Sequence, residues 1–347
     1  MGNTMKKAVI HAPRQARLVD VPIPEPRGDL VLIRVRAVPM CTEYKTWESG
    51  RTAEALGHEG VGEVAAVDGH SDLAVGDRVV ILGLFSCGTC RYCRAGHVMH
   101  CMNKVRHPSQ ANGQTGSPPR TGAYAQFRLA RSWMLPRIPD DISFEQAALT
   151  WCGLGPTFGA MQRMAVDAFD TVLVTGAGPV GLGALVNAAS RGARAIVVEG
   201  VPWRVERARA MGAAAVLDPA DPELVAHIRS LTTDGLGVDC AVECAGVVAA
   251  QRVCVEAARP RGQVAFVAEC NEELPIRVSP DMIRTGLTLI GQWHYSMNDF
   301  ERLLAVVRSS PLLDQHVSHR LPLSRVQEAL ELCASHQCGK VILDPWK

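Results

Sequence analysis

Short apolar runs alternate with longer stretches of helical periodicity in the second half of the chain. Runs dominated by small and β-branched residues occur at Thr171–Thr175, Ala195–Glu199, Val238–Glu243 and Gln263–Val267. The stretches between these runs are long enough to form helices. Strands that alternate with helices pair in parallel, so this half of the chain predicts a doubly wound α/β sheet.

The first 150 residues follow a different pattern. Their β-rich runs are short and are separated by Pro- and Gly-rich turns; they fall at Lys7–His11, Leu30–Val38, Val61–Val67 and Arg78–Leu82. This spacing predicts a domain built mainly of strands and turns. The last 60 residues contain both helix-like and strand-like runs and could extend either domain.

Composition excludes several classes of protein. The chain has 347 residues, of which 47% are hydrophobic and 20% charged, with a formal net charge of +1. Without a basic stripe or an acidic tail, neither nucleic acid nor a membrane surface is an expected partner. No long apolar stretch resembles a signal peptide or a spanning helix, so we expect a cytoplasmic protein. In that compartment the 12 cysteines indicate metal ligation rather than disulfides.

Four cysteines are concentrated in one short segment. Their spacing is C-x2-C-x2-C-x7-C, formed by Cys87, Cys90, Cys93 and Cys101. An iron–sulfur run would have three residues before its last cysteine, and free thiols at this density would be a coincidence. Four thiolates at this spacing can close a tetrahedron around zinc, which leaves no position open for a substrate. The segment therefore predicts a structural zinc site.

A glycine-rich turn follows the run at Thr171–Thr175. It fits G-x-G-x-x-G, with a strand before it and a helix after it, and Glu199 ends the next strand. This context predicts an NAD site, with the pyrophosphate on the helix N-terminus and Glu199 bound to the adenine ribose. Arg204 could soften the discrimination against NADP. The residues of the turn are Gly176, Gly178, Pro179, Val180 and Gly181.

Further motifs carry a resemblance to a known family. The segment Gly57–Val64 (GHEGVGEV) resembles a G-H-E-x-x-G-x-V signature, and Gly76–Val79 (GDRV) resembles the strand that follows it. With the four-cysteine spacing, these motifs resemble the zinc-dependent medium-chain dehydrogenase/reductase family. The resemblance implies a Rossmann domain over residues 154–287. Residues 1–153 and 288–347 would form a mainly β, GroES-like catalytic domain. The resemblance also implies that Lys340 contacts the pyrophosphate of the cofactor.

The same resemblance implies a second, catalytic zinc, and hence two Zn²⁺ per chain. Cys41 and His58 fall at the positions of its ligands, Cys152 falls at that of the third, and Glu59 lies beside the metal. Two thiolates and one imidazole leave a fourth coordination position open for water or substrate. An alcohol at that position would lose a proton and transfer a hydride to NAD, which yields a ketone.

The segment after Cys41 departs from the family pattern. Where the family has a hydroxyl residue two positions on and a histidine five positions on, this chain has Glu43 and Thr46. We expect Glu43 to accept the proton that the alcohol releases. Thr42, Tyr44 or water could do so instead, and Glu43 could also be a solvated residue without a role.

Substrate preference is predicted from four polar or aromatic residues. Glu43, Trp47, His294 and Tyr295 fall where related polyol dehydrogenases have polar groups beside the substrate. Such a pocket favours a polyol, cyclitol or aminocyclitol over a simple alcohol. We expect small-molecule alcohol and ketone partners and, by resemblance, a homo-oligomer (tetramer or dimer).

Three other functions remain open. The first is a simple alcohol or aldehyde dehydrogenase. The second is a zinc-free reductase of activated alkenes or quinones, which would not need Cys41, His58 and Cys152. The third is a non-catalytic structural protein with the same fold.

Overall fold

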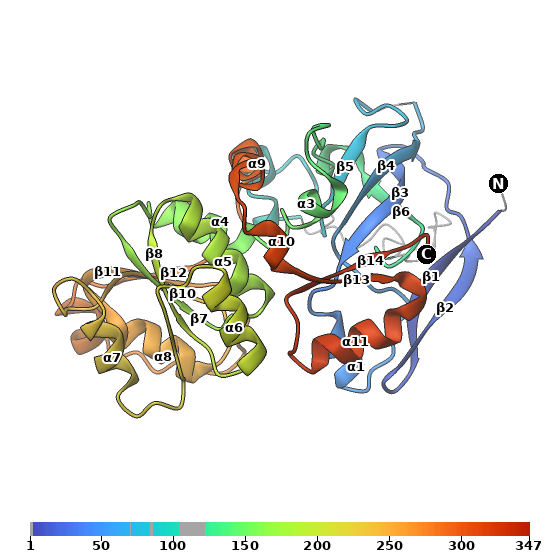
Figure 1. The fold of residues 1–347 in the computed structure, drawn as a ribbon. Helices are drawn as coiled ribbons and strands as arrows, with labels where there is room; N and C mark the ends of the chain where they lie inside the picture. The colour runs from blue at the N-terminus through green and yellow to red at the C-terminus, as the bar shows by residue number, and fades with distance from the viewer. Residues whose placement is uncertain (1–2, 70, 84–85, 104–121) are drawn as a thin grey trace.

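A computed structural model describes residues 3–69, 71–83, 86–103 and 122–347. It contains two six-stranded sheets that lie side by side, each with its own helices (Figure 1). One sheet is parallel throughout, in the order β12-β11-β10-β7-β8-β9. Its strands are β7 (Thr171–Thr175), β8 (Arg194–Val198), β9 (Ala215–Leu217), β10 (Val238–Glu243), β11 (Ala258–Phe266) and β12 (Thr288–Gly291).

Helices cover both faces of this parallel sheet because successive strand residues point to opposite sides. Val172 and Val174 of β7 pack with the helices α4 and α5, whereas Leu173 packs on the opposite face with α7 and α8. Burial on both faces explains why the strands are almost purely apolar. The helices are α4 (Gly155–Arg163), α5 (Pro179–Ser190), α6 (Pro202–Ala210), α7 (Leu224–Ser230) and α8 (Val248–Ala257).

The second sheet is mixed and runs in the order β13-β14-β3-β4-β5, with β6 also paired to β3. Among its described strands, β13 and β14 are parallel to each other and the other pairs are antiparallel. A separate hairpin, β1–β2, packs nearby. The strands are β1 (Thr4–Ala12), β2 (Gln15–Pro22), β3 (Leu30–Pro39), β4 (Gly60–Ala66), β5 (Arg78–Ile81), β6 (Phe127–Arg131), β13 (Val317–Pro322) and β14 (Lys340–Asp344).

The remaining helices are short or lie along the boundary between the sheets. They are α1 (Glu43–Glu48), α2 (Arg91–Arg94), α3 (Phe144–Ala148), α9 (Phe300–Ser309), α10 (Leu313–His316) and α11 (Val326–Ala334). Among the described residues, no helix is long and apolar enough to cross a membrane.

The predicted fold class is confirmed: a doubly wound parallel sheet adjoins a mainly β domain. The expected division of the chain differs from the structure at one strand. We assigned residues from 288 onward to the catalytic domain, but Thr288–Gly291 pairs with β11 and completes the parallel sheet. The four residues of this strand carry too little pattern to choose a sheet, and the pairing partner decides it.

Candidate functional site

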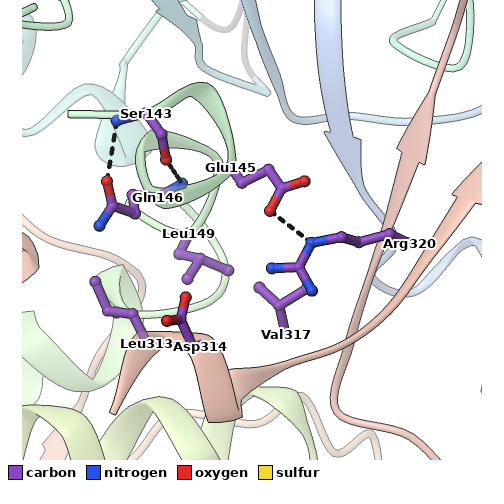
Figure 2. A pocket seen from close by; sticks show the side chains of 8 residues that line it. All are labelled: Ser143, Glu145, Gln146, Leu149, Leu313, Asp314, Val317 and Arg320. Atoms are coloured by element: carbon purple, nitrogen blue, oxygen red, sulfur yellow. Dashed lines mark hydrogen bonds and ion pairs between the residues drawn. The ribbon is translucent and has the colours of Figure 1, made fainter. Parts of the chain in front are cut away.

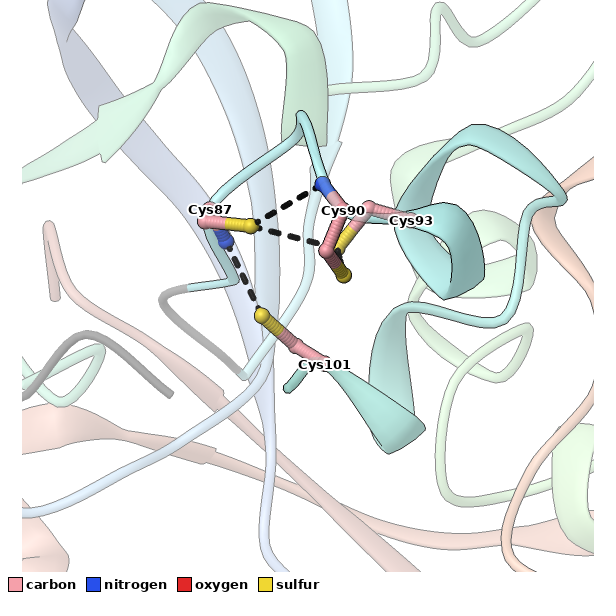
Figure 3. A group of neighbouring side chains, drawn as sticks. All are labelled: Cys87, Cys90, Cys93 and Cys101. Atoms are coloured by element: carbon pink, nitrogen blue, oxygen red, sulfur yellow. Dashed lines mark hydrogen bonds between the residues drawn. The ribbon is translucent and has the colours of Figure 1, made fainter. Parts of the chain in front are cut away.

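The four clustered cysteines converge on one point (Figure 3). Their sulfur atoms all lie within 4.8 Å of one another. Cys93 Sγ lies 3.5 Å from Cys90 Sγ and 4.0 Å from Cys87 Sγ. Tetrahedral zinc thiolates have sulfur atoms about 3.8 Å apart, because each Zn–S bond is about 2.3 Å. The group Cys87, Cys90, Cys93 and Cys101, called here the cysteine lobe, therefore fits a zinc ion.

Backbone amides stabilise negative charge within the cysteine lobe. The N–H of Cys90 donates to Cys87 Sγ at 3.4 Å, and the N–H of Cys87 donates to Cys101 Sγ at 3.3 Å. The amides of Thr89 and Cys90 lower the pKa of Cys87 to about 5. The lobe is also docked on the segment after β12, where the N–H of Met297 donates to the carbonyl of Gly96 at 2.9 Å.

A second group of possible ligands lies between the two domains. Cys41 follows β3, His58 and Glu59 precede β4, and Cys152 precedes α4. One ligand atom from each of the four lies within 4.8 Å of the others. His58 Nε2 is 3.2 Å from Cys152 Sγ, so this nitrogen faces the thiols. We call these four residues the mixed metal group.

A carboxylate orients the imidazole of the mixed metal group. Glu43 Oε1 lies 2.6 Å from His58 Nδ1, and its Oε2 accepts from the Cys41 N–H at 3.0 Å and the Tyr124 hydroxyl at 2.9 Å. Burial would raise the pKa of Glu43, but the charge and hydrogen bond of His58 and the backbone amides of Glu43 and Cys41 hold it at about 2. An ionised Glu43 keeps the proton on Nδ1 and leaves Nε2 free to bind a metal.

This geometry excludes one of the alternatives for Glu43. The side chain is only 8% exposed, so it is not a solvated residue. Both of its oxygens already accept hydrogen bonds, which fits a residue that orients His58 better than one that accepts the alcohol proton. Tyr124 was not anticipated because no spacing in the sequence links it to Glu43.

A buried ion pair supports the other side of the mixed metal group. Lys340 Nζ lies 2.8 Å from Glu59 Oε1 and donates to the Met40 carbonyl at 3.1 Å. Glu59 Oε2 accepts from the N–H of Cys152 at 2.9 Å. Both charged side chains are almost completely buried, at 0% and 1% exposure. A hydrogen bond from Cys152 and, to a smaller extent, the charge of Lys340 lower the pKa of Cys41.

Lys340 therefore does not occupy the expected place at the pyrophosphate. β14 pairs with the end of β3, where the N–H of Met40 donates to the Val341 carbonyl at 2.8 Å. This pairing directs the ammonium of Lys340 into the mixed metal group. The sequence shows a lysine after a glycine but not which strand lies beside it.

The glycine-rich turn has the shape that a dinucleotide requires. Gly176 has φ +82°, and a Cβ on Gly181 would lie 1.8 Å from the Gly176 carbonyl oxygen. Glu199 accepts hydrogen bonds from the amide of Ala177 at 2.7 Å and from that of Val201 at 2.8 Å. The turn and Glu199 are thus brought together at the start of α5, where Pro179 and Val180 form the first turn of the helix. The N-terminus of a helix favours a phosphate.

Two of the expected substrate residues lie near the mixed metal group. His294 stacks on Trp151 with ring centres 4.0 Å apart, and its Nε2 is 3.8 Å from Cys152 Sγ. Burial and repulsion by His58 lower the pKa of His294 to about 3, so its ring is neutral. The rings of Tyr295 and Trp151 meet edge to face, with their centres 5.9 Å apart. Trp151 itself was not anticipated.

Trp47 lies elsewhere. Its indole N–H donates to Gln327 Oε1 at 3.3 Å, and its ring is buried in the apolar core of the β domain. The expected contact between Trp47 and the substrate is therefore not supported. An aromatic residue near a ligand in sequence packs with the core when its face of the helix points inward.

A pocket of about 250 Å³ lies between α3 and α10 (Figure 2). The ion pair between Glu145 and Arg320, at 2.7 Å, spans it. None of its lining residues belongs to either metal group or to the glycine-rich turn. It is not part of the candidate site.

Comparisons with known proteins agree with this fold. The family described as an alcohol dehydrogenase GroES-like domain matches residues 27–140, and that described as a zinc-binding dehydrogenase matches residues 179–309. The sorbitol dehydrogenase of Bacillus subtilis (strain 168) is 31% identical over 98% of this chain and 97% of its own length. The L-threonine 3-dehydrogenase of Anaeromyxobacter sp. (strain Fw109-5) is 33% identical over 94% of both chains.

Among solved structures, the alcohol dehydrogenase of Thermus sp. ATN1 superimposes with a TM-score of 0.85. It is 28% identical, and the match covers 98% of this chain and 99% of that one. The fold and these matches define a zinc-binding oxidoreductase. The chain belongs to the zinc-type medium-chain dehydrogenase family.

Proposed function

We propose that the protein is an NAD-linked alcohol dehydrogenase that oxidises a secondary alcohol reversibly to a ketone. The observation that carries the proposal is the close packing of the segment next to Cys152 against the helix that begins at the glycine-rich turn. A Cβ on Gly183 of α5 would lie 1.9 Å from the Gly153 carbonyl oxygen, so the segment that carries Cys152 rests on the helix that begins at the turn. A metal and a dinucleotide held on these two parts would be neighbours.

The proposal includes two zinc ions with different roles. The cysteine lobe offers four thiolates and would be a closed, structural site. Cys41, His58 and Cys152 offer three ligands and would leave one position open. Glu59 would stand outside the ligands, because both of its oxygens are engaged by Lys340 and the Cys152 amide.

Zinc bound to the mixed metal group would supply the Lewis acidity that favours loss of the alcohol proton, and NAD would accept the hydride. The protein's own residues would fix the geometry of this reaction. Glu43 holds the tautomer of His58, and Lys340 balances the charge of Glu59. His294, stacked on Trp151, presents an uncharged ring.

We assign the proton to Thr42 rather than to Glu43. Thr42 follows the proposed ligand Cys41 directly, is exposed, and makes no capping hydrogen bond to α1. Its hydroxyl can therefore accept a proton from the alcohol while donating its own to water, whereas the oxygens of Glu43 are occupied.

The proposed substrate is a polyol, cyclitol or aminocyclitol. Among the described residues, His294 Nδ1 and the Tyr295 hydroxyl are buried and have no hydrogen-bond partner. Such groups gain from a substrate that carries several hydroxyls, and they disfavour one that leaves them unpaired. Two of the relatives are named as a sorbitol dehydrogenase and an L-threonine 3-dehydrogenase, which supports a substrate with more than one polar group.

The direct test combines metal analysis with an activity panel. Purified protein should contain two zinc ions per chain and should reduce NAD⁺, followed by absorbance, with polyols as donors. A hexitol should give a higher kcat/KM than 2-hexanol, which lacks the additional hydroxyls. Activity without zinc at Cys41, His58 and Cys152 would refute the mechanism, and a preference for 2-hexanol would refute the substrate class.

A further inference from the structure

His336 forms a contact between the two domains. It follows α11 of the β domain, and its Nδ1 accepts a hydrogen bond from Arg204 Nη2 at 3.2 Å. Arg204 belongs to α6 beside the parallel sheet, and α6 and α11 face each other across the domain boundary (Figure 1). The Tyr44 ring meets the edge of the His336 ring, with centres 6.0 Å apart and planes at 86°. The imidazole is thus held on two sides.

Arg204 in turn lies over the glycine-rich turn. A Cβ on Gly178 would be 3.7 Å from the central carbon and from both terminal nitrogens of the guanidinium. The Nε of Arg204 is buried and has no hydrogen-bond partner among the described residues. Gly178 is the residue directly before α5, where a phosphate group would lie. The guanidinium is therefore on the phosphate side of the turn.

We infer that His336 is a positioning residue that holds Arg204 ready to bind the pyrophosphate of a dinucleotide. The inference rests on the proposed function, since it requires a dinucleotide at the turn. A guanidinium has five N–H donors in a fixed plane, and the contact with His336 uses one of them. Nε, Nη1 and the second N–H of Nη2 remain, so one forked pair of donors that includes Nη2 is still free to bind phosphate oxygens.

The backbone at His336 provides a matched pair of variants. His336 has φ +60°, a conformation in which glycine is unstrained and asparagine is tolerated. His336→Gly removes the hydrogen-bond acceptor, whereas His336→Asn keeps one in its side-chain carbonyl. Both variants suit this backbone, so a difference between them reports the hydrogen bond rather than a folding defect.

The experiment measures the equilibrium affinity for NADH by fluorescence titration. His336→Gly should weaken binding roughly three- to tenfold, the range that one such hydrogen bond accounts for. His336→Asn should restore most of the affinity. ADP-ribose, which has the pyrophosphate but no nicotinamide, should lose affinity to the same extent in competition with NADH. In turnover assays the effect should fall on the KM for NAD rather than on kcat.

A double-mutant cycle with Arg204→Gln tests the route of the effect. If His336 acts through Arg204, then His336→Gly should cause no further loss in the Arg204→Gln background. Equal affinity of His336→Gly and the wild type would overturn the inference, as would equal losses in the glycine and asparagine variants. A wild-type protein that binds no NADH would instead refute the proposed function, and the inference with it.

Discussion

The cysteine lobe and the mixed metal group both gather sulfur ligands, but their surroundings differ. The lobe takes its four thiols from residues 87–101, and the donors to the sulfurs of Cys87 and Cys101 are uncharged: backbone amides and the side chains of Thr89 and Asn103. The mixed metal group takes its ligands from three separate segments and is supported by the charged side chains of Glu43 and Lys340. Local backbone geometry is sufficient to bring four thiols together as a metal site. A reactive site needs buried charges that only the folded domains can supply.

Net charge is part of the same contrast. Four thiolates exceed the charge of a divalent ion, whereas two thiolates and an imidazole only balance it. The carboxylate of Glu59 is compensated by Lys340 and does not add to the negative charge. An ion in the mixed metal group would therefore remain the stronger Lewis acid.

The largest expected effects come from removing one thiol from each group. Cys41→Ser should abolish activity with little loss of stability, because it opens a catalytic site. Cys90→Ser should lower the melting temperature and the soluble yield, because a closed zinc site contributes directly to folding energy. Activity, zinc content and thermal unfolding of both variants would check this. If Cys41→Ser unfolds as readily as Cys90→Ser, the two groups do not differ in role.

Lys340→Met should have the next largest effect, which is a loss of free energy of unfolding. It leaves the buried carboxylate of Glu59 without its counterion, a change that costs about 3–5 kcal/mol. Denaturant unfolding should show most of this loss recovered in the double variant Lys340→Met/Glu59→Gln. The exposed pair Arg325–Glu328 is the control, and Arg325→Met should cost less than about 1 kcal/mol.

Glu43→Gln should have a moderate effect on metal binding. Removing the partner of a metal-binding histidine typically lowers metal affinity by about 10- to 100-fold, which competition with a zinc chelator would measure. The pKa of Glu43 is about 2, below the ordinary value, so its contribution is lost only as pH falls toward 2. The activity ratio of wild type to variant should therefore be constant from about pH 6 to 9. Partial rescue of the variant at high pH would restore Glu43 as the proton acceptor.

The smallest expected effect is on cofactor choice. Glu199→Ala should raise the kcat/KM ratio for NADP over NAD by roughly tenfold, equivalent to about 1.4 kcal/mol, since the carboxylate no longer repels a 2′-phosphate. Glu199→Gln separates the loss of charge from the loss of hydrogen bonds to Ala177 and Val201. The zinc content should not change in either variant. A wild-type enzyme that already prefers NADP would contradict this assignment.

Features that depend on nearby residues could be predicted from the sequence. The thiol spacing of the cysteine lobe and the glycines of the turn are of this kind, because the residues that act together are close to one another in the sequence. The alternation of strands and helices was sufficient to predict the parallel sheet.

The supporting residues could not be predicted because strand pairing brings them together. The contact of Glu59 with Lys340 spans 281 residues, and that of Glu43 with Tyr124 spans 81. The family pattern identified Glu43 and Lys340 as functional positions but gave them partners that the structure does not. Trp47 was misjudged for a related reason, because proximity to Cys41 in sequence does not fix the direction of a side chain.

The pairing of β14 with β3 also sets an order of events during synthesis on the ribosome. Lys340 is made 281 residues after Glu59, which at about 5–20 residues per second is roughly 15 to 60 s later. The four thiols of the cysteine lobe have all been made once Cys101 has emerged, so a metal ion at this site would find its ligands early. The carboxylate of Glu59 waits without its counterion until β14 arrives. The cysteine lobe thus has all its thiols early in translation, whereas Glu59 of the mixed metal group gains its buried counterion only when β14 has docked.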